Sequence, residues 1–315
     1  MIDAETLGLL RGSLREVLTT GGDVGVALQE LGWDDVMADD LAAATTCLFE
    51  LQGETLAVSD QVDAVAAAAA RLPNATVFAW PDPAAGAGAL TAGIVDGRVT
   101  VNGLTTAVLE PSTSVAVPTE AGLVLVEASS LAAVPVRGID PDLGWSRVSG
   151  AALAGEAVGI WDAALAATRR AIASELVGVS AAMLALATAH VSAREQFGRP
   201  IGSYQSVRHR LAEAYAFVEG ARATVGAAWS DGRSGAAGVA KAVAGRAHAD
   251  VAKHCLQVCG AMGLTWEFEL HRFVRRGYAL DTLLGSYRQL ARASGRSLLA
   301  GAPLQRVGSP SVAVV

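Results

Sequence analysis

The residues of this chain that could do chemistry gather in one short segment. The segment reads Arg194-Glu195-Gln196-Phe197-Gly198-Arg199-Pro200-Ile201-Gly202-Ser203-Tyr204-Gln205. Part of it needs only a structural explanation, because Gly198 can end a helix, Pro200 can stop it and Ser203 can cap the next helix. The residues left without a packing role are Arg194, Gln196, Phe197 and Gln205. A guanidinium, two amides and an aromatic ring on one corner indicate a ligand-binding site.

Long helices must position this segment. Beyond Gly150, apolar residues recur at helical spacing in four stripes, which run over 165–186, 204–229, 239–262 and 280–290. Four amphipathic helices of this kind predict a bundle, with the segment at the corner between its first and second helices.

Composition divides the whole chain into three domains and a tail. Residues 1–73 combine helical spacing with an Ala-rich stretch and predict an N-terminal helical domain. Residues 74–150 contain short β-branched runs between turn residues and predict a small middle β domain. Residues 151–305 hold the four-helix bundle, and residues 306–315 form a tail that is either frayed or docked on a partner. The fold class is therefore mainly α with a small β domain.

The pattern R-x-x-F-G-x-x-I-x-x-x-Q at this corner resembles the flavin-contacting corner of the acyl-CoA dehydrogenases. A second segment, Gln257 to Thr265, is similar to that family's Q-x-x-G-G-x-G stretch, with Gly260 present and Ala261 in place of the second glycine. The three-domain order is also that of the family. The resemblance implies FAD as cofactor and α,β-desaturation of an acyl-CoA thioester as reaction. It also implies an electron-transfer flavoprotein or a similar acceptor for the electrons.

The residues of the two segments suit such a cofactor. Arg194 offers a planar fork to the FAD pyrophosphate, and the amides of Gln205 and Gln257 can donate and accept around the adenosine half. Gln205 is expected in the first turn of a helix, where unpaired N–H groups attract anions. In this family the corner reaches across a dimer interface to the flavin that the neighbouring subunit holds.

The half of the flavin site that a subunit keeps for itself is degraded in this chain. Self-sufficient relatives have a T-E-P-x-x-G-S-D loop, and the nearest segment, Trp80 to Gly88, matches only a proline and the first glycine. The N-G-x-K-x-W-x-[TS] strand of relatives becomes 102–107 without the lysine and the aromatic residue. We therefore expect no complete flavin site within this chain.

The catalytic base is also missing from its usual place. The family's E-G-[TS] motif aligns with Leu284-Gly285-Ser286, and the alternative position just before an arginine on the first bundle helix reads Thr168-Arg169. Glu175, two turns further on the same face, is a possible displaced base, because burial can raise a carboxylate pKa. We favour the simpler interpretation, in which Glu175 pairs with an arginine or lies on a solvated helix edge.

These features together predict a non-catalytic subunit. The expected assembly is a heteromeric, α2β2 acyl-CoA dehydrogenase, in which a paralogous subunit supplies the glutamate and acts on an acyl-CoA substrate. Such unequal pairs resemble the actinobacterial enzymes that shorten steroid side chains, so a steroid substrate is one expectation and a simple fatty acyl group another. Two alternatives stay open: a homo-oligomeric enzyme with an unrecognised base, and a flavin-free scaffold subunit.

Other partners and sites are not expected. A formal charge of −7 with only two lysines excludes nucleic acid. The apolar run 176–189 is shorter than a bilayer span and predicts a buried helix, so no membrane is expected. Three cysteines without framework spacing and an acidic start suit a cytoplasmic protein. Cys255 and Cys259 are expected in the core and no metal site is predicted. His190 and His271 are taken as structural, and Arg275 and Arg276 receive no role.

Overall fold

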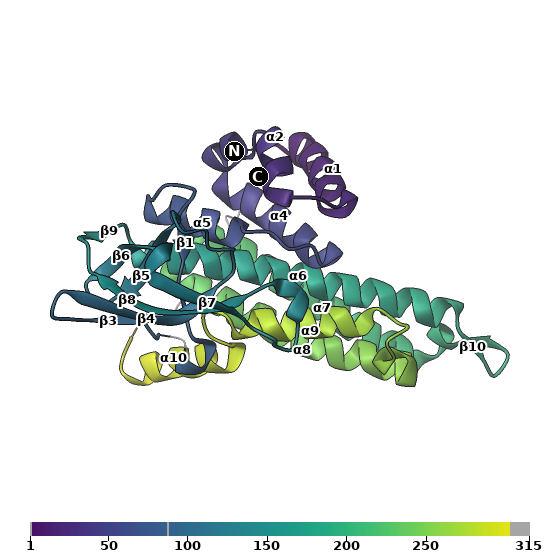
Figure 1. Cartoon of the computed structure of the whole chain (residues 1–315). Helices are drawn as coiled ribbons and strands as arrows, with labels where there is room; N and C mark the ends of the chain where they lie inside the picture. The colour runs from purple at the N-terminus through teal and green to yellow at the C-terminus, as the bar shows by residue number, and fades with distance from the viewer. Residues whose placement is uncertain (1, 87, 303–315) are drawn as a thin grey trace, which may run out of the picture.

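The computed structural model describes residues 2–86 and 88–302, so the tail expected at 306–315 lies outside the described residues. Helices α1 to α5 form a compact group at one side of the molecule, with α4 lying along a long central helix (Figure 1). Three of these helices begin at aspartates, Asp3, Asp23 and Asp40, whose carboxylates accept hydrogen bonds from first-turn N–H groups. Their bounds are α1 Ala4–Thr20, α2 Val24–Glu30, α3 Trp33–Asp39, α4 Leu41–Thr55 and α5 Gln61–Ala70.

The middle region consists of two small sheets packed on a core of valines. One sheet has the strand order β1-β5-β6-β9, and the other has the order β2-β4-β8-β7 with β3 paired to β4. The strands are β1 Val77–Phe78, β2 Trp80–Pro81, β3 Ala92–Val95, β4 Arg98–Thr105, β5 Ser114–Thr119, β6 Gly122–Glu127, β7 Leu131–Pro135, β8 Ser146–Leu153 and β9 Ala157–Val158. The expected boundary at residue 150 falls inside β8, so the β region extends to Val158. Three short 3₁₀ helices, η1 Pro83–Ala85, η2 Ala128–Ser130 and η3 Pro141–Leu143, connect these strands.

The three longest C-terminal helices, α6, α7 and α8, lie side by side along the molecule, each antiparallel to the one before it in the chain (Figure 1). They are α6 Trp161–Ala193, α7 Gln205–Asp231, α8 Ser234–Cys259, α9 Leu270–Thr282 and α10 Tyr287–Leu299. The fourth apolar stripe is therefore two short helices and not the single long helix that its spacing predicts. The chain breaks at Leu284 and Gly285, which have φ of 59° and 99°, and Ser286 then caps α10 through a capping box with Gln289.

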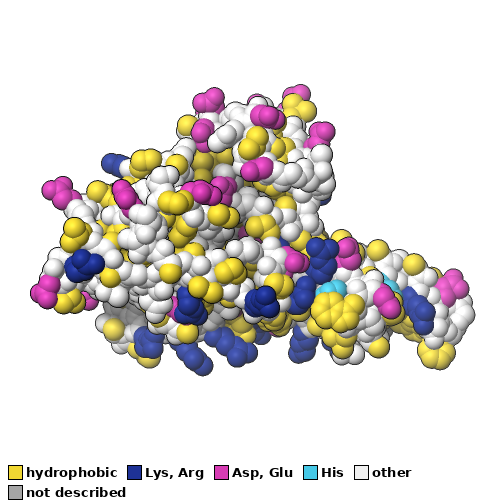
Figure 2. Space-filling model, viewed as in Figure 1, with side chains coloured by type: hydrophobic (Ala, Val, Ile, Leu, Met, Phe, Trp, Pro, Cys, Tyr) yellow, Lys and Arg dark blue, Asp and Glu magenta, His cyan; other side chains and the backbone are white. Residues whose placement is uncertain are grey.

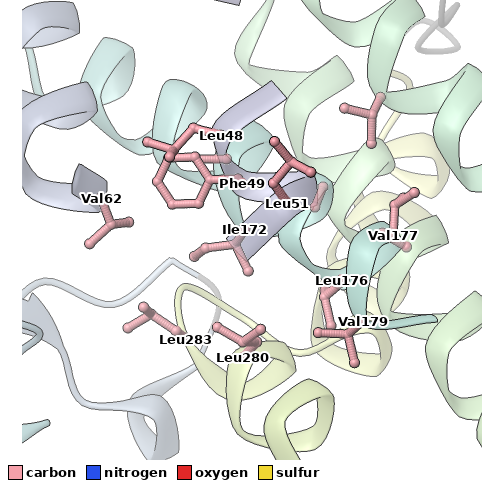
Figure 3. Close-up of a cluster of buried hydrophobic side chains, with 14 of the residues drawn as sticks. Leu48, Phe49, Leu51, Val62, Ile172, Leu176, Val177, Val179, Leu280 and Leu283 are labelled. Carbon is pink, nitrogen blue, oxygen red and sulfur yellow. The ribbon is translucent and has the colours of Figure 1, made fainter. Parts of the chain in front are cut away.

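Helix α6 forms the centre of the protein. Side chains from α4, α5, α6 and α9 meet in one hydrophobic cluster (Figure 3). Helices α4 and α6 touch backbone to backbone, because a Cβ at Gly178 would lie 1.9 Å from the carbonyl oxygen of Glu50. Helix α6 is long and apolar enough to cross a membrane, but 67% of its most apolar stretch is buried within the protein. The expected helix at 176–189 is part of α6; it is buried over 176–180 and partly exposed further on, at Ala185, Thr188 and Ala189.

Candidate functional site

The corner between α6 and α7 is a hairpin that extends past the end of the bundle (Figure 1). Its strands, β10 Glu195–Gln196 and β11 Arg199–Pro200, pair across Phe197 and Gly198, which have φ of 54° and 79°. Gly198 therefore serves a two-residue hairpin turn and does not end a helix. Ser203, expected to cap α7, instead donates its hydroxyl to the carbonyl of Pro200.

Phe197 lies at the tip of this hairpin and is 92% exposed. An aromatic side chain in water and a positive φ at a residue with a Cβ are both unfavourable in an isolated chain. Features of this kind persist where the tip meets another molecule. The position suits the predicted contact with a neighbouring subunit.

Arg194 and Gln205 frame the hairpin with exposed side chains. The carbonyl of Arg194 accepts the N–H of Ile201 at 2.8 Å, which fixes the backbone beside its side chain. Gln205 begins α7, as predicted, so its amide lies among the free N–H groups of the first turn. The Gln196 side chain donates to the carbonyl of Glu195 at 2.8 Å, and its own carbonyl accepts the hydroxyl of Tyr204.

The second predicted segment lies at the same end of the bundle. Gln257 is exposed in the last turn of α8, and Gly260, with φ of 62°, leads into the short helix η5 Gly260–Leu264. The ring of Phe268, which follows η5, lies 5.3 Å from the ring of His190 near the end of α6. The fold thus brings the two segments to one end, although they are separated by more than fifty residues. Ala261 is exposed beside Gly260.

Three polar side chains at this end of the bundle are available to a ligand. Within residues 2–86 and 88–302, the side chains of Arg194, Gln205 and Gln257 make no hydrogen bond or ion pair. A guanidinium and two amides that face solvent keep their capacity for phosphate and adenosine groups. The side chains of Arg194, Gln205 and Gln257, called the tip residues below, therefore have the chemistry to bind one part of FAD.

The segments that align with the flavin-binding loop and strand of self-sufficient relatives, which the sequence predicts to be degraded, make contacts within the chain. Trp80 is fully buried and stacks on Phe78 with ring centroids 4.8 Å apart. Asp82 caps η1 and pairs with Arg147 at 2.8 Å, and Thr106 donates its hydroxyl to Asp63. The side chains of Trp80, Asp82 and Thr106 are therefore engaged within the chain.

The two positions considered for a catalytic base lie next to each other in space. The guanidinium Nε of Arg169 donates to the carbonyl of Leu284 at 3.1 Å, although 115 residues separate them. Leu284 is buried, and the adjacent Thr168 is fully buried. Burial lowers the pKa of Arg169 to about 10. Neither Thr168 nor Leu284 supplies a carboxylate, and the charged group that contacts Leu284 is the guanidinium of Arg169.

Sequence reasoning missed a buried lysine at the same turn. The ammonium of Lys241 on α8 donates to the carbonyls of Asp281 at 2.9 Å and Gly285 at 2.7 Å. Burial lowers its pKa to about 7, and Arg169 adds to this effect while the Asp281 carboxylate opposes it. The signal in the sequence was a lysine between Val239 and Val243, within the apolar stripe of an Ala-rich helix.

Glu175 is a structural residue in a buried network that joins all three domains. Its carboxylate accepts the amide of Gln52 at 3.1 Å and lies 3.7 Å from the guanidinium of Arg276. Arg276 also pairs with Asp140 of the β region at 2.5 Å and donates to the carbonyl of Ala57. Burial raises the pKa of Glu175 to about 7. The favoured interpretation, a pair with an arginine, is confirmed, whereas Arg276, given no role, is the centre of this network.

The cysteines and histidines behave as core residues. Burial raises the pKa of the Cys255 and Cys259 thiols to about 12 and about 11. Among the described residues, no group of three or more His, Cys, Asp or Glu side chains could hold a metal ion. His271 bonds through Nδ1 to the carbonyl of Phe268 at 2.9 Å, and His190 packs on the ring of the same residue.

Comparison with known proteins bears on this arrangement. Residues 158–298 match the family described as Acyl-CoA dehydrogenase, C-terminal domain. The acyl-CoA dehydrogenase IpdE2 of Mycolicibacterium smegmatis is 35% identical over 121 residues, which are 38% of this chain and 39% of that protein. The acyl-CoA dehydrogenase FadE34 of Mycobacterium tuberculosis is 42% identical over 128 residues, 38% of this chain and 18% of FadE34. The matches thus span well under half of these relatives.

Solved structures share the whole fold. A variant of the Tcur3481-Tcur3483 steroid ACAD has a TM-score of 0.79 at 22% identity, covering 94% of this chain and 98% of that one. The ChsE4-ChsE5 complex from Mycobacterium tuberculosis has a TM-score of 0.75 at 21% identity, covering 96% and 99%. A glutaryl-CoA dehydrogenase of the same fold was solved in complex with FADH2. Residues 158–298, a little less than half of this chain, are thus similar to the C-terminal domain of the acyl-CoA dehydrogenases, and the whole chain shares the fold of these solved structures.

Proposed function

We propose that this chain is the non-catalytic subunit of a heteromeric FAD-dependent acyl-CoA dehydrogenase. The observation that carries the proposal is a contrast within one molecule. The tip residues Arg194, Gln205 and Gln257 are exposed and fit half of an FAD site. At the usual position of the base, the chain has the buried Leu284, held by Arg169.

Each tip residue has a role in this proposal. Arg194 binds the pyrophosphate, and Gln205 and Gln257 bind the adenosine half, of the FAD that a paralogous subunit holds. Gln196 and Phe197 complete the contact, with the backbone at Gly260 and Ala261 beside them. When bound, FAD supplies the acceptor for the hydride that leaves the β-carbon of the acyl-CoA. Because neither of the family's two base positions carries a carboxylate in this chain, where they are Thr168 and Leu284, we assign the glutamate that removes the α-proton to the paralogue.

The similarity to the ChsE4-ChsE5 complex supports two unlike chains as the functional unit. The assembly that follows is an α2β2 heterotetramer with two flavins, located in the cytoplasm and delivering electrons to an electron-transfer flavoprotein or a similar acceptor. The similarity to a steroid ACAD supports a CoA thioester of a steroid side chain as substrate.

Two preparations test this proposal: this chain purified alone, and this chain purified together with the protein that the neighbouring gene encodes. We expect the lone chain to be colourless and the pair to carry flavin absorbance and to reduce a redox dye with an acyl-CoA. Flavin-loaded, active enzyme from the lone chain would reject the proposal in favour of a homo-oligomer. A colourless, inactive complex would instead identify a scaffold subunit.

A second candidate function rests on Glu175. Its pKa of about 7 is suited to a general base, and a self-sufficient enzyme could use it. Its carboxylate is only 4% exposed and engaged by Gln52 and Arg276, so we rank this candidate below the first.

A further inference from the structure

The hairpin between α6 and α7 receives little support from its own strands. Its ribbon has two residue pairs, Glu195 with Pro200 and Gln196 with Arg199. Figure 2 shows that the end of the molecule where Figure 1 draws β10 extends beyond the β region and the N-terminal helices. A two-stranded hairpin is marginally stable by itself in water, and the positive φ of Phe197 adds strain to this one. Contacts outside the ribbon must therefore hold its shape.

Tyr204, the residue before α7, contacts both strands of this hairpin. Its hydroxyl donates to the backbone carbonyl of Gln196 on β10 at 3.4 Å. The guanidinium carbon of Arg199 on β11 lies 4.0 Å from the centre of the Tyr204 ring, which is the geometry of a cation–π contact. Within residues 2–86 and 88–302, Arg199 forms no ion pair with a carboxylate. One side chain thus joins the two strands.

The backbone of Tyr204 is itself fixed at the start of α7. Its N–H donates to the carbonyl of Ile201 at 3.2 Å, and its carbonyl accepts the N–H of Val207 at 3.1 Å. The turn before it packs closely on α6, because a Cβ at Gly202 would lie 3.0 Å from the carbonyl oxygen of Val191. The ring of Tyr204 therefore projects from a backbone that the bundle holds in place.

Two tip residues lie on either side of this contact. The carbonyl of Arg194, before the hairpin, accepts the N–H of Ile201, and Gln205 directly follows Tyr204. We infer that Tyr204, with Arg199 stacked on its ring, is a positioning residue that orders the hairpin, and with it the guanidinium of Arg194, before FAD binds. The inference rests on the proposed function. Order that exists before binding removes an entropic cost from binding.

The alternative is a direct contact of these two side chains with FAD. A tyrosine hydroxyl and a guanidinium can both bind phosphate. In this chain, however, the Tyr204 hydroxyl is donated to a backbone carbonyl and the Arg199 guanidinium lies on the ring. The two roles predict different results, because a positioning residue acts through Arg194 and a direct contact acts without it.

Two variants remove the stack from opposite sides. Tyr204→Leu removes the ring, and Arg199→Ala removes the exposed guanidinium. Tyr204→Phe keeps the ring and loses only a long hydrogen bond, so it should restore the behaviour of the wild type. Tyr215→Leu, at an exposed tyrosine further along α7, is the matched control. Circular dichroism and thermal melting establish that each variant folds.

The affinity of the complex for FAD is measured by titrating the flavin-depleted complex with FAD and following flavin fluorescence. We expect Tyr204→Leu and Arg199→Ala to weaken binding about three- to tenfold, and Tyr204→Phe and Tyr215→Leu to stay within about twofold of the wild type. In the background of Arg194→Ala, the change Tyr204→Leu should cause less than about a twofold further loss, because the group that it positions is gone. Unchanged affinity of both stack variants would overturn the inference. A full further loss in the Arg194→Ala background would overturn it as well, since it would indicate a direct contact.

Hydrogen exchange of the lone chain tests the order of the hairpin without FAD. We expect the amides of residues 194–201 to exchange at least about threefold faster in Tyr204→Leu and Arg199→Ala than in Tyr204→Phe, and those of α8 to be unchanged. Unchanged exchange over 194–201 would overturn the inference while leaving the proposed function intact. A wild-type complex that binds no FAD would instead count against the proposed function, and the inference would fall with it.

Discussion

The two ends of the bundle use polar side chains in opposite ways. At the tip, Arg194, Gln205 and Gln257 face solvent. At the other end, Arg169 and Lys241 are buried and donate to carbonyls of the chain itself. Polar groups that satisfy one another fix a turn, whereas exposed groups remain available to another molecule. This contrast is what the proposed function predicts: the exposed groups are available to another molecule, and the buried groups stabilise the chain's own turn.

The largest effect is expected at the buried Arg276. Arg276→Ala leaves Asp140 and Glu175 without their cation, so the free energy of unfolding should fall by about 3–5 kcal/mol. Urea denaturation followed by circular dichroism measures this change. The neighbouring Arg275→Ala is the matched control and should have a much smaller effect. Equal stability of the two variants would contradict a buried network at this junction.

At the tip the same kind of substitution should act on the cofactor and not on folding. Arg194→Ala removes an exposed guanidinium, so the unfolding midpoint should stay within error of the wild type. FAD affinity of the complex should fall about tenfold or more, because a charge-assisted contact to phosphate is lost. Flavin absorbance after dialysis measures occupancy, with Arg210→Ala as the control. Full FAD occupancy in the complex of Arg194→Ala would show that the exposed guanidinium of Arg194 does not bind the cofactor.

The buried lysine predicts a pH dependence at the interior end. Lys241 has a pKa of about 7 in the folded protein and 10.5 as its ordinary value, so the unfolded chain binds more protons between these limits. Stability should therefore rise with pH from 7 to 9.

The variant Lys241→Met lacks this group, and its stability should rise less over the same interval. Urea midpoints at pH 7, 8 and 9 for both proteins provide the measurement. If the urea midpoints of the two proteins changed equally with pH, Lys241 would have to stay charged in the folded protein.

The smallest effect is expected from Glu175→Gln. An amide keeps the shape of the side chain and its contact with Gln52, and the complex needs no base from this chain. Turnover of the complex, measured by dye reduction at full FAD occupancy, should be nearly unchanged. A large loss of turnover would support the displaced base.

The tip could be predicted from the sequence because its signal is local. Residues 194–205 lie close together in the chain, so their types and spacing are visible as a sequence motif. The hairpin itself was not predicted, since Gly198 suits both a helix end and a two-residue turn. The break at Leu284 was hidden because the apolar stripe continues across it at nearly helical spacing.

The interior end depends on contacts between residues far apart. Arg276 meets Asp140 across 136 residues, and Lys241 meets Gly285 across 44. Periodicity places such side chains on helices but does not show which neighbours cover them. Burial decides both the pKa of Lys241 and the structural role of Glu175, and burial is a property of the packed molecule.

The proposal that this chain binds FAD only together with its paralogue is tested most directly by the number of flavins bound per chain. In the purified complex, flavin absorbance and amino-acid analysis should give one FAD for each pair of unlike chains, and the lone chain should bind none. One FAD for each chain would show that this polypeptide holds its own cofactor, and it would contradict the account.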